Sequence, residues 1–286
     1  LAGFDFRMDA QDATARATYR FDRLKAPFYG VLEAGWMSFS LVVAIRYFDA
    51  PEAVKACIAG AGPIGFLLSP VVLFAVAWLR GRPSTACGAI FLASALCLAG
   101  TTFSASLAVF AVLAIASQTI AVQQSTLMLH IYAANYAPHE RGSRITMPLI
   151  LTSLAAILFA LLGGWILDRD IAYYRIVYAI MACAALAAAA AVSRIPVAPL
   201  STRHVGNPWQ NLSLIWKDPF FGYLLGSWML LGLGNLVTMP IRVEYVANPA
   251  FGINADNTTI AFLLLVVPSA TRILSTRMWG RIFDRF

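Results

Sequence analysis

The first apolar run of the sequence contains polar and aromatic side chains that could contact a solute. They recur at helical spacing and therefore share one face: Tyr29, Glu33, Trp36 and Ser40. Glu33 is the one carboxylate that lies well inside an apolar run, and ionisable groups in lipid-facing sequence are costly and usually functional. Facing a cavity, Glu33 would bind a cationic or hydroxylated solute or take up a proton. Alternatively, it pairs with an Arg or Lys of the preceding N-terminal segment.

A second polar stripe follows the same spacing further along the chain. Its members are Thr119, Gln123, Thr126 and His130. Four polar residues on one side of an apolar helix predict a hydrated face. The first three would then line a cavity, which we favour, or hydrogen-bond to neighbouring helices. His130 lies near the end of the run, where a position at the membrane interface is the simpler interpretation.

A third face combines Trp228, Gly232 and Asn235. The Asn235 amide would contact a ligand or make a structural hydrogen bond. Arg272 lies in a later apolar run, where it would pair with a substrate anion or, as we favour, extend to the cytoplasmic surface. The predicted substrate-binding residues are therefore Glu33, Trp36, Thr119, Gln123, Thr126, Trp228 and Asn235.

The elements that must position these residues are membrane-spanning helices. Hydrophobic residues make up 60% of the 286 residues and charged residues only 12%, with a mean hydropathy of +0.72, which is too apolar for a water-soluble domain. Crossing about 30 Å of hydrocarbon takes about 20 apolar residues. Eight runs qualify, near 27–48, 53–79, 84–104, 106–134, 145–167, 171–193, 219–241 and 258–279.

The distribution of Lys and Arg predicts the orientation of these helices. Most of the 21 basic residues fall on one side of the predicted membrane if the N-terminus is cytoplasmic. The exceptions are Arg46, Lys55, Arg169, Arg175 and Arg242. The chain then divides into a cytoplasmic N-terminal segment (1–26), a six-helix bundle (27–193), a cytoplasmic linker (194–218) and two further helices (219–286). The linker carries an amphipathic pattern at Trp209, Leu212, Ile215 and Trp216 that predicts an interfacial helix.

Three short motifs lie in or beside the predicted loops. They are Tyr136–Gly142 (YAPHERG), Gly163–Asp168 (GGWILD) and Gly280–Arg285 (GRIFDR). Together with the six-plus-two arrangement of helices, they resemble the major facilitator superfamily, whose loop between helices four and five and whose G-x-x-x-D-R loop have similar sequences. The loop after the second helix, Trp78–Pro83, keeps only part of that signature, and the fourth helix has no intramembrane Arg. The resemblance implies that Gly280, Asp284, Arg285 and Arg141 are gating residues.

The resemblance also implies a fold and a function. The fold would be an all-α transmembrane bundle with eight of a probable twelve helices present. The function would be secondary active transport of a small solute, with or without a co-transported ion, by alternating access. The protein would be monomeric in a plasma membrane, of the bacterial inner-membrane type. The alternative is a transporter-like sensor or scaffold that binds a ligand without moving it.

Other classes of function find little support in the sequence. The net charge of +7 comes from scattered basic residues and follows the topology, so nucleic acid is not an expected partner. Three His residues without metal-ligand spacing and one intramembrane carboxylate do not form an enzyme constellation. We therefore expect no catalytic residues, no cofactor and no metal site. The four Cys residues lie in apolar runs and are interpreted as packing residues.

Overall fold

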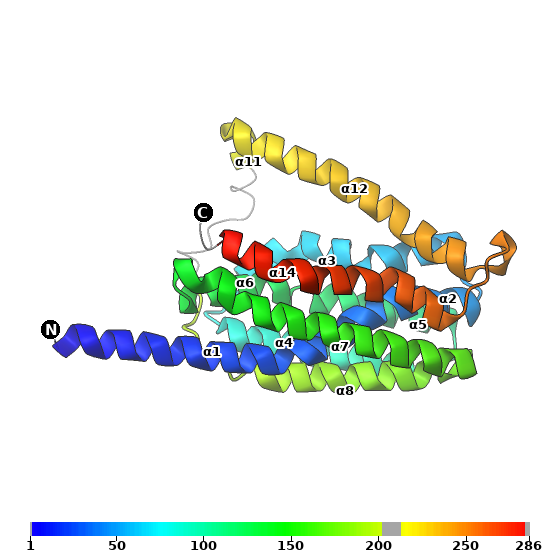
Figure 1. The fold of residues 1–286 in the computed structure, drawn as a ribbon, viewed down its shortest axis with the longest axis horizontal. Coiled ribbons are helices and arrows are strands. Elements are labelled where there is room, and N and C mark those ends of the chain that lie inside the picture. Colours follow the sequence, from blue (N-terminus) through cyan, green and yellow to red (C-terminus); the bar gives the residue numbers. More distant parts are fainter. Residues whose placement is uncertain (1, 202–212, 284–286) are drawn as a thin grey trace.

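The structure, a computed structural model, describes residues 2–201 and 213–283. Every regular element in this part of the chain is a helix (Figure 1). Within it, eight helices are long and apolar enough to cross a membrane. They coincide with the eight apolar runs of the sequence, so the all-α class and the number of spanning-length helices are confirmed.

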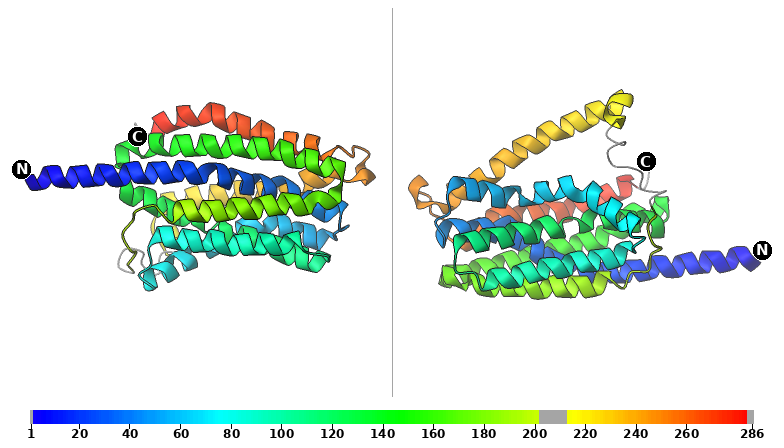
Figure 2. Two further views of the ribbon diagram at one scale, coloured as in Figure 1. Left: turned by 90° about the horizontal axis from the view of Figure 1, so that it is seen from below. Right: turned by 180° about the vertical axis from the view of Figure 1, so that it is seen from behind.

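The first of these helices begins earlier than the sequence suggested. α1 (Ala2–Ala34) continues through a π-helical turn, η1 (Gly35–Phe39), into α2 (Ser40–Arg46). The polar segment that precedes the apolar run near residue 27 is also helical, as its content of the helix formers Ala and Arg favours. Pro27 lies inside α1 without ending it. Figure 2 shows α1 extending well beyond the other helices.

The other elements follow in the order expected. The spanning-length helices are α3 (Glu52–Trp78), α4 (Pro83–Thr102), α5 (Leu107–Ala121) with α6 (Gln124–Asn135), α7 (Arg141–Arg169), α8 (Tyr174–Val192) and α12 (Pro219–Ala247). The last one starts as α13 (Asn257–Ala261) and passes through a π-helical turn, η5 (Phe262–Val266), into α14 (Val267–Phe283). Short elements connect them: η2 (Pro138–Glu140), η3 (Ile171–Tyr173), α11 (Leu214–Lys217) and η4 (Pro249–Phe251).

The connections gather at two ends of the molecule, because successive spans run in opposite directions (Figure 1). At one end, called here the Arg46 end, Tyr174 Oη donates to the Ser104 carbonyl (2.7 Å). At the other, called the Asn135 end, Asn135 Nδ2 donates to the Pro196 carbonyl (2.8 Å). The sequence predicts that the Asn135 end is cytoplasmic.

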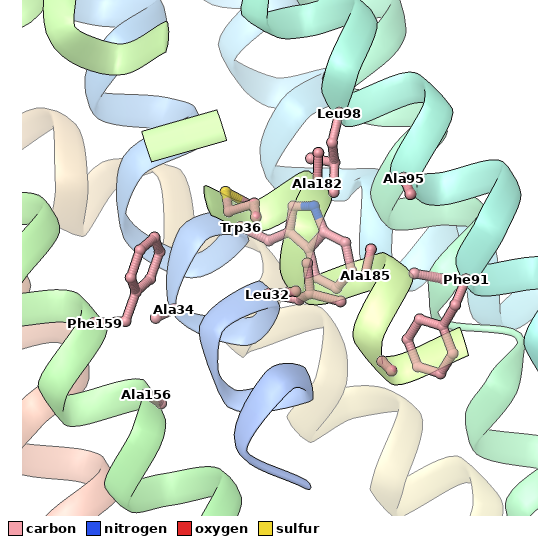
Figure 3. Packing of buried hydrophobic residues seen from close by; sticks show 14 of the residues in the cluster. Leu32, Ala34, Trp36, Phe91, Ala95, Leu98, Ala156, Phe159, Ala182 and Ala185 are labelled. Carbon is pink, nitrogen blue, oxygen red and sulfur yellow. The ribbon is translucent and has the colours of Figure 1, made fainter. Parts of the chain in front are cut away.

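The core of the bundle surrounds the π-helical turn of the first span. Leu32 and Trp36 lie among the buried Phe91 and small side chains that include Ala182 and Ala185 (Figure 3). Small residues let the helices approach closely. A Cβ on Gly164 would lie 2.8 Å from the Cα of Thr258, so α7 packs closely against α13 at this glycine.

α12 differs from the other helices because it leans away from the bundle along much of its length (Figures 1 and 2). It joins the rest at the Arg46 end through a small apolar cluster, formed by Leu41, Val42, Val243, Ala247 and Ile260. A Cβ on Gly226 would meet no atom within 4 Å. No helix of the described structure packs against α12 at Gly226, although a Cβ on Gly222 would meet the Ile215 carbonyl.

The predicted interfacial helix of the linker falls largely on residues that the structure does not describe. Trp209 and Leu212 lie outside the described residues. The following residues form α11, where Trp216 is 78% exposed.

Candidate solute-binding cavity

A cavity of about 720 Å³ lies between α1, η1, α3, α5, α6 and α7 on one side and α12 and α14 on the other. Its wall is mainly apolar and includes Met37, Phe66 and Met128. It reaches toward the Asn135 end, where Tyr132 and Ile145 belong to the lining. A mainly apolar pocket with a few polar groups is typical of a small-molecule site.

An ion pair in the cavity wall joins the first span to the eighth. Arg272 Nη1 donates to Glu33 Oε1 (2.8 Å), and Arg272 Nη2 donates to Glu33 Oε2 (3.2 Å). Arg272 Nε donates to Ser153 Oγ of α7 (2.7 Å). The Arg272 side chain is 36% exposed and that of Glu33 is 22% exposed. The pair is therefore bidentate and accessible from the cavity. The proposed pairing of Glu33 with an N-terminal basic residue is wrong, and Arg272 does not extend to the cytoplasmic surface.

A second charged cluster lies in the same wall, on the part of α1 that the sequence assigned to the N-terminal segment. Lys25 Nζ is 2.9 Å from Asp22 Oδ1, and Tyr132 Oη donates to Asp22 Oδ2 (2.7 Å). Asp22 and Lys25 are buried. These residues were not predicted as part of a site because their run is polar. Their spacing of three residues, typical of a helical ion pair, was the available signal.

Trp36 and Gln124 add polar atoms to the cavity wall. Trp36 lies in η1, and its indole Nε1 donates to Ser117 Oγ (3.1 Å). Single π-helical turns often occur at functional sites. The buried Gln124 lines the cavity, and its Oε1 has no hydrogen-bond partner within the described part of the chain. Gln124 Oε1 is thus a buried acceptor beside the cavity that is not itself exposed to it.

The structure places Thr119 and Gln123 in a helix contact and not in the cavity. Gln123 Nε2 donates to the Gly65 carbonyl of α3 (2.6 Å), and Ser69 Oγ donates to Gln123 Oε1 (2.9 Å). Thr119 Oγ1 donates to the Ala61 carbonyl (3.0 Å). This geometry favours the alternative reading of the stripe, hydrogen bonding between helices, because the spacing defined a face without defining its direction.

Some of the other predicted binding residues line the cavity and some do not. Of these, Glu33, Trp36 and Asn235 line the cavity, whereas Thr126 and Trp228 do not. Trp228 is 68% exposed and lies on the helix that leans away from the bundle.

The Arg46 end is closed by a network around a single guanidinium. Arg46 Nη2 donates to the Ala247 carbonyl (3.1 Å) and to the Ala255 carbonyl (2.5 Å), and Nη1 donates to Asn257 Oδ1 (2.6 Å). Lys55 of α3 adds an ion pair to Glu244 of α12 (2.9 Å). These contacts join the first two spans to the last two.

Asp168 makes a second closure at the same end. Its Oδ1 accepts from Asn257 N (2.6 Å), and its Oδ2 accepts from Thr258 N (3.1 Å) and Thr258 Oγ1 (2.6 Å). A carboxylate at a helix N-terminus meets unpaired N–H groups and the positive end of the helix dipole. Asp256 caps the same helix, and its hydrogen bond with Thr259 lowers the pKa of the Asp256 carboxyl.

The predicted gating residues lie at the Asn135 end. Arg141 Nη2 donates to the carbonyls of Ala133 (3.2 Å) and Tyr136 (3.4 Å), which end α6. A Cβ on Gly280 would lie 2.5 Å from Thr146 Oγ1 of α7, so α14 and α7 approach closely there. Asp284 and Arg285 lie outside the described residues.

No group of three His, Cys, Asp or Glu side chains within residues 2–201 and 213–283 is placed to hold a metal ion. The wall of the cavity contains two ion pairs, Trp36 and Gln124, and is otherwise mainly apolar.

Comparison with known proteins identifies the fold. The chain matches a partially occluded inward-open conformation of the xylose transporter XylE from E. coli, with a TM-score of 0.57 and 15% sequence identity. The match covers 95% of this chain and 74% of that chain. The chain therefore shares the fold of that transporter, in agreement with the all-α transmembrane bundle that the resemblance implied. No family model and no curated protein matches the sequence.

Proposed function

We propose that this protein is a secondary active transporter that carries a small solute across a membrane by alternating access. The observation that carries the proposal is the cavity of about 720 Å³, which has charged groups in its wall and lies between the first six spans and the last two. Alternating access requires such a site between two groups of helices that move relative to each other.

The two ends of the molecule support this mechanism because they differ. Arg46, Lys55 and Asp168 tie the two groups of helices together at the Arg46 end. The cavity reaches toward the opposite end, and its lining there includes Tyr132 and Ile145. An arrangement closed at one end and approached from the other is one of the two states that a carrier must adopt.

The proposal includes the topology expected from the sequence. Segment 27–193 is the first moving bundle, 219–286 belongs to the second, and 194–218 is the cytoplasmic linker. The N-terminus and the Asn135 end face the cytoplasm. The protein acts as a monomer in the plasma membrane, and a co-transported ion accompanies the solute if the transport is coupled.

Counterflow in proteoliposomes tests the proposal. Vesicles containing the purified protein are loaded with one unlabelled solute from a panel of sugars, carboxylates, amino acids and drugs, and entry of the same labelled solute is followed. We expect saturable entry that preloading accelerates, because a carrier exchanges solute as its site alternates. Absence of entry for the whole panel, with correctly inserted protein, would contradict transport. Saturable binding without entry would instead identify a sensor or scaffold.

A further inference from the structure

We propose that the solute carries a carboxylate, which takes the place of the Glu33 carboxylate on the guanidinium of Arg272. This inference rests on the proposed transport function and adds a substrate class to it. Its basis is a bidentate ion pair that is accessible from the cavity and joins two helices that alternating access must separate.

Arg272 is arranged to hold a planar, two-oxygen group. Its hydrogen bond to Ser153 Oγ (2.7 Å) fixes the plane of the guanidinium, and two further N–H groups point at the two oxygens of Glu33. The guanidinium is a rigid fork of donors that matches a carboxylate in two parallel hydrogen bonds. A ligand carboxylate reproduces both contacts, whereas the single oxygen of an amide or a hydroxyl group replaces one.

Charge balance explains why the ligand must supply the carboxylate. When α1 and α14 separate, Arg272 loses Glu33, and a charge that is only partly exposed to water is left without its partner. A ligand carboxylate restores the neutrality of Arg272. Glu33 then requires one positive charge, either an ammonium group on the same solute or a proton from the bulk water. The other charged groups of the wall, Asp22 and Lys25, already compensate each other at 2.9 Å.

Gln124 indicates what the rest of the solute contains. Gln124 is 4% exposed, and its Oε1 has no hydrogen-bond partner within the described part of the chain. A buried acceptor left unpaired is unfavourable, and a rotation of the Gln124 amide toward the cavity would let an O–H or N–H group of a ligand pair with it. The site therefore fits a small amino carboxylate or hydroxy carboxylate.

Matched pairs of ligands test this class. The probes are amino acids and hydroxy acids with side chains from methyl to indolyl, each beside its own primary amide. Binding is measured on the purified full chain as ligand-induced stabilisation, which follows from preferential binding to the folded state. We expect at least one acid to bind at least ten-fold more tightly than its amide. Equal binding of acids and amides, or no binding by any acid, would overturn the proposal.

Three variants locate the carboxylate and its compensating charge. Arg272→Gln should weaken acid binding at least ten-fold. Because that change leaves Glu33 unpaired, the double variant Glu33→Gln/Arg272→Gln, which is neutral at both positions, provides a folded protein that should not bind the acid.

In Glu33→Gln the amide imitates a protonated carboxyl, so simple acids should bind at least as tightly if a proton is the compensating charge. If the ammonium group of an amino acid is the compensating charge, amino acids should bind this variant about ten-fold more weakly. Gly226→Ala, which fills open space on α12, is the matched control and should bind normally. Unchanged acid binding by the double variant would contradict the assigned site.

The results for binding and for transport separate the two proposals. Counterflow of neutral solutes, with every acid inert, would sustain the transport function and reject the carboxylate. Acid binding that requires Arg272 but produces no counterflow would sustain the site and reject the transport.

Discussion

Two adjacent glutamines of the fourth span have different environments. Gln123 bonds to Gly65 and Ser69 of α3, while the buried Oε1 of Gln124 has no hydrogen-bond partner within the described residues. Successive residues of a helix point in different directions, so the two side chains meet different neighbours. Gln123 joins this span to α3, and Gln124 belongs to the lining of the cavity.

The glutamine pair gives a prediction at the residue scale. Gln123→Ala should lower the free energy of unfolding by about 1–3 kcal/mol, because it leaves the Gly65 carbonyl and the Ser69 hydroxyl unpaired. The affinity for the solute should change little. Gln124→Ala should have little effect on stability but should raise the half-saturating solute concentration about ten-fold, the equivalent of one hydrogen bond of about 1.4 kcal/mol. Thermal unfolding and counterflow measured on both variants check this. The reverse pattern would contradict the assignment.

The ion pair shows what sequence spacing can and cannot predict about the site. The position of Glu33 within an apolar run identified it as a functional candidate, because such a carboxylate is costly in lipid. Its partner lies 239 positions away, and no local pattern relates residues at that separation. Likewise, the stripe containing Gln123 was recognised as polar, but only the packing of α5 against α3 determines which neighbour it faces.

At the scale of elements, the contact between α7 and α13 depends on a glycine. A Cβ on Gly164 would meet the backbone of Thr258 and Asn257 at 2.8–3.1 Å, which cannot relax like the end of a flexible side chain. A Cβ added to Gly226 on α12, by contrast, would have no neighbouring atom within 4 Å.

Gly164→Ala should therefore push α13 away from α7 and loosen the hydrogen bonds that Asp168 accepts. We expect slower counterflow and a destabilisation of about 1–3 kcal/mol, the usual cost of overpacking. Gly226→Ala, the matched control, should be neutral or stabilising by about 0.5–1 kcal/mol, because Ala favours a helix over Gly. Melting temperatures of the two variants compare them directly. Equal effects would show that the α7–α13 contact is not tight.

The helices themselves were predictable because lipid imposes a strict requirement. Backbone groups in hydrocarbon must pair within the helix, so each long apolar run has one stable conformation. Helix ends outside the hydrocarbon do not obey this requirement, which explains why the apolar run near residue 27 did not reveal that α1 begins at Ala2. The inclination of α12 was also beyond prediction, since its composition is that of any spanning helix.

At the scale of the whole molecule, the Arg46 end explains some exceptions in the distribution of charge. Of the basic residues expected outside the membrane against the usual bias, Arg46 and Lys55 bond to groups of the last two spans. Their position follows from inter-helix contacts and not from the orientation signal. The sequence alone identified them as exceptions without supplying this reason.

Locking this end tests the proposed motion. In a background with Cys57, Cys87, Cys97 and Cys183 replaced by Ala, the variant Asp168→Cys/Thr258→Cys brings two thiols to positions now joined by a 2.6 Å hydrogen bond. Oxidation or a short bifunctional reagent should stop counterflow by at least ten-fold, because the two groups of helices can no longer separate. A reductant should restore the flux of the disulfide form. Each single cysteine variant is the control. Complete cross-linking with undiminished flux would contradict movement at this end.

The paired charges of the cavity wall also determine how the protein responds to voltage. With Asp22 neutralised by Lys25 and Glu33 by Arg272, the unloaded cavity carries no net charge through the electric field. Each elementary charge that crosses contributes about 2.3 kcal/mol per 100 mV, so any current must come from the cargo and its accompanying ions. The membrane voltage that halts net flow at a fixed concentration gradient therefore measures the charge transported in each cycle.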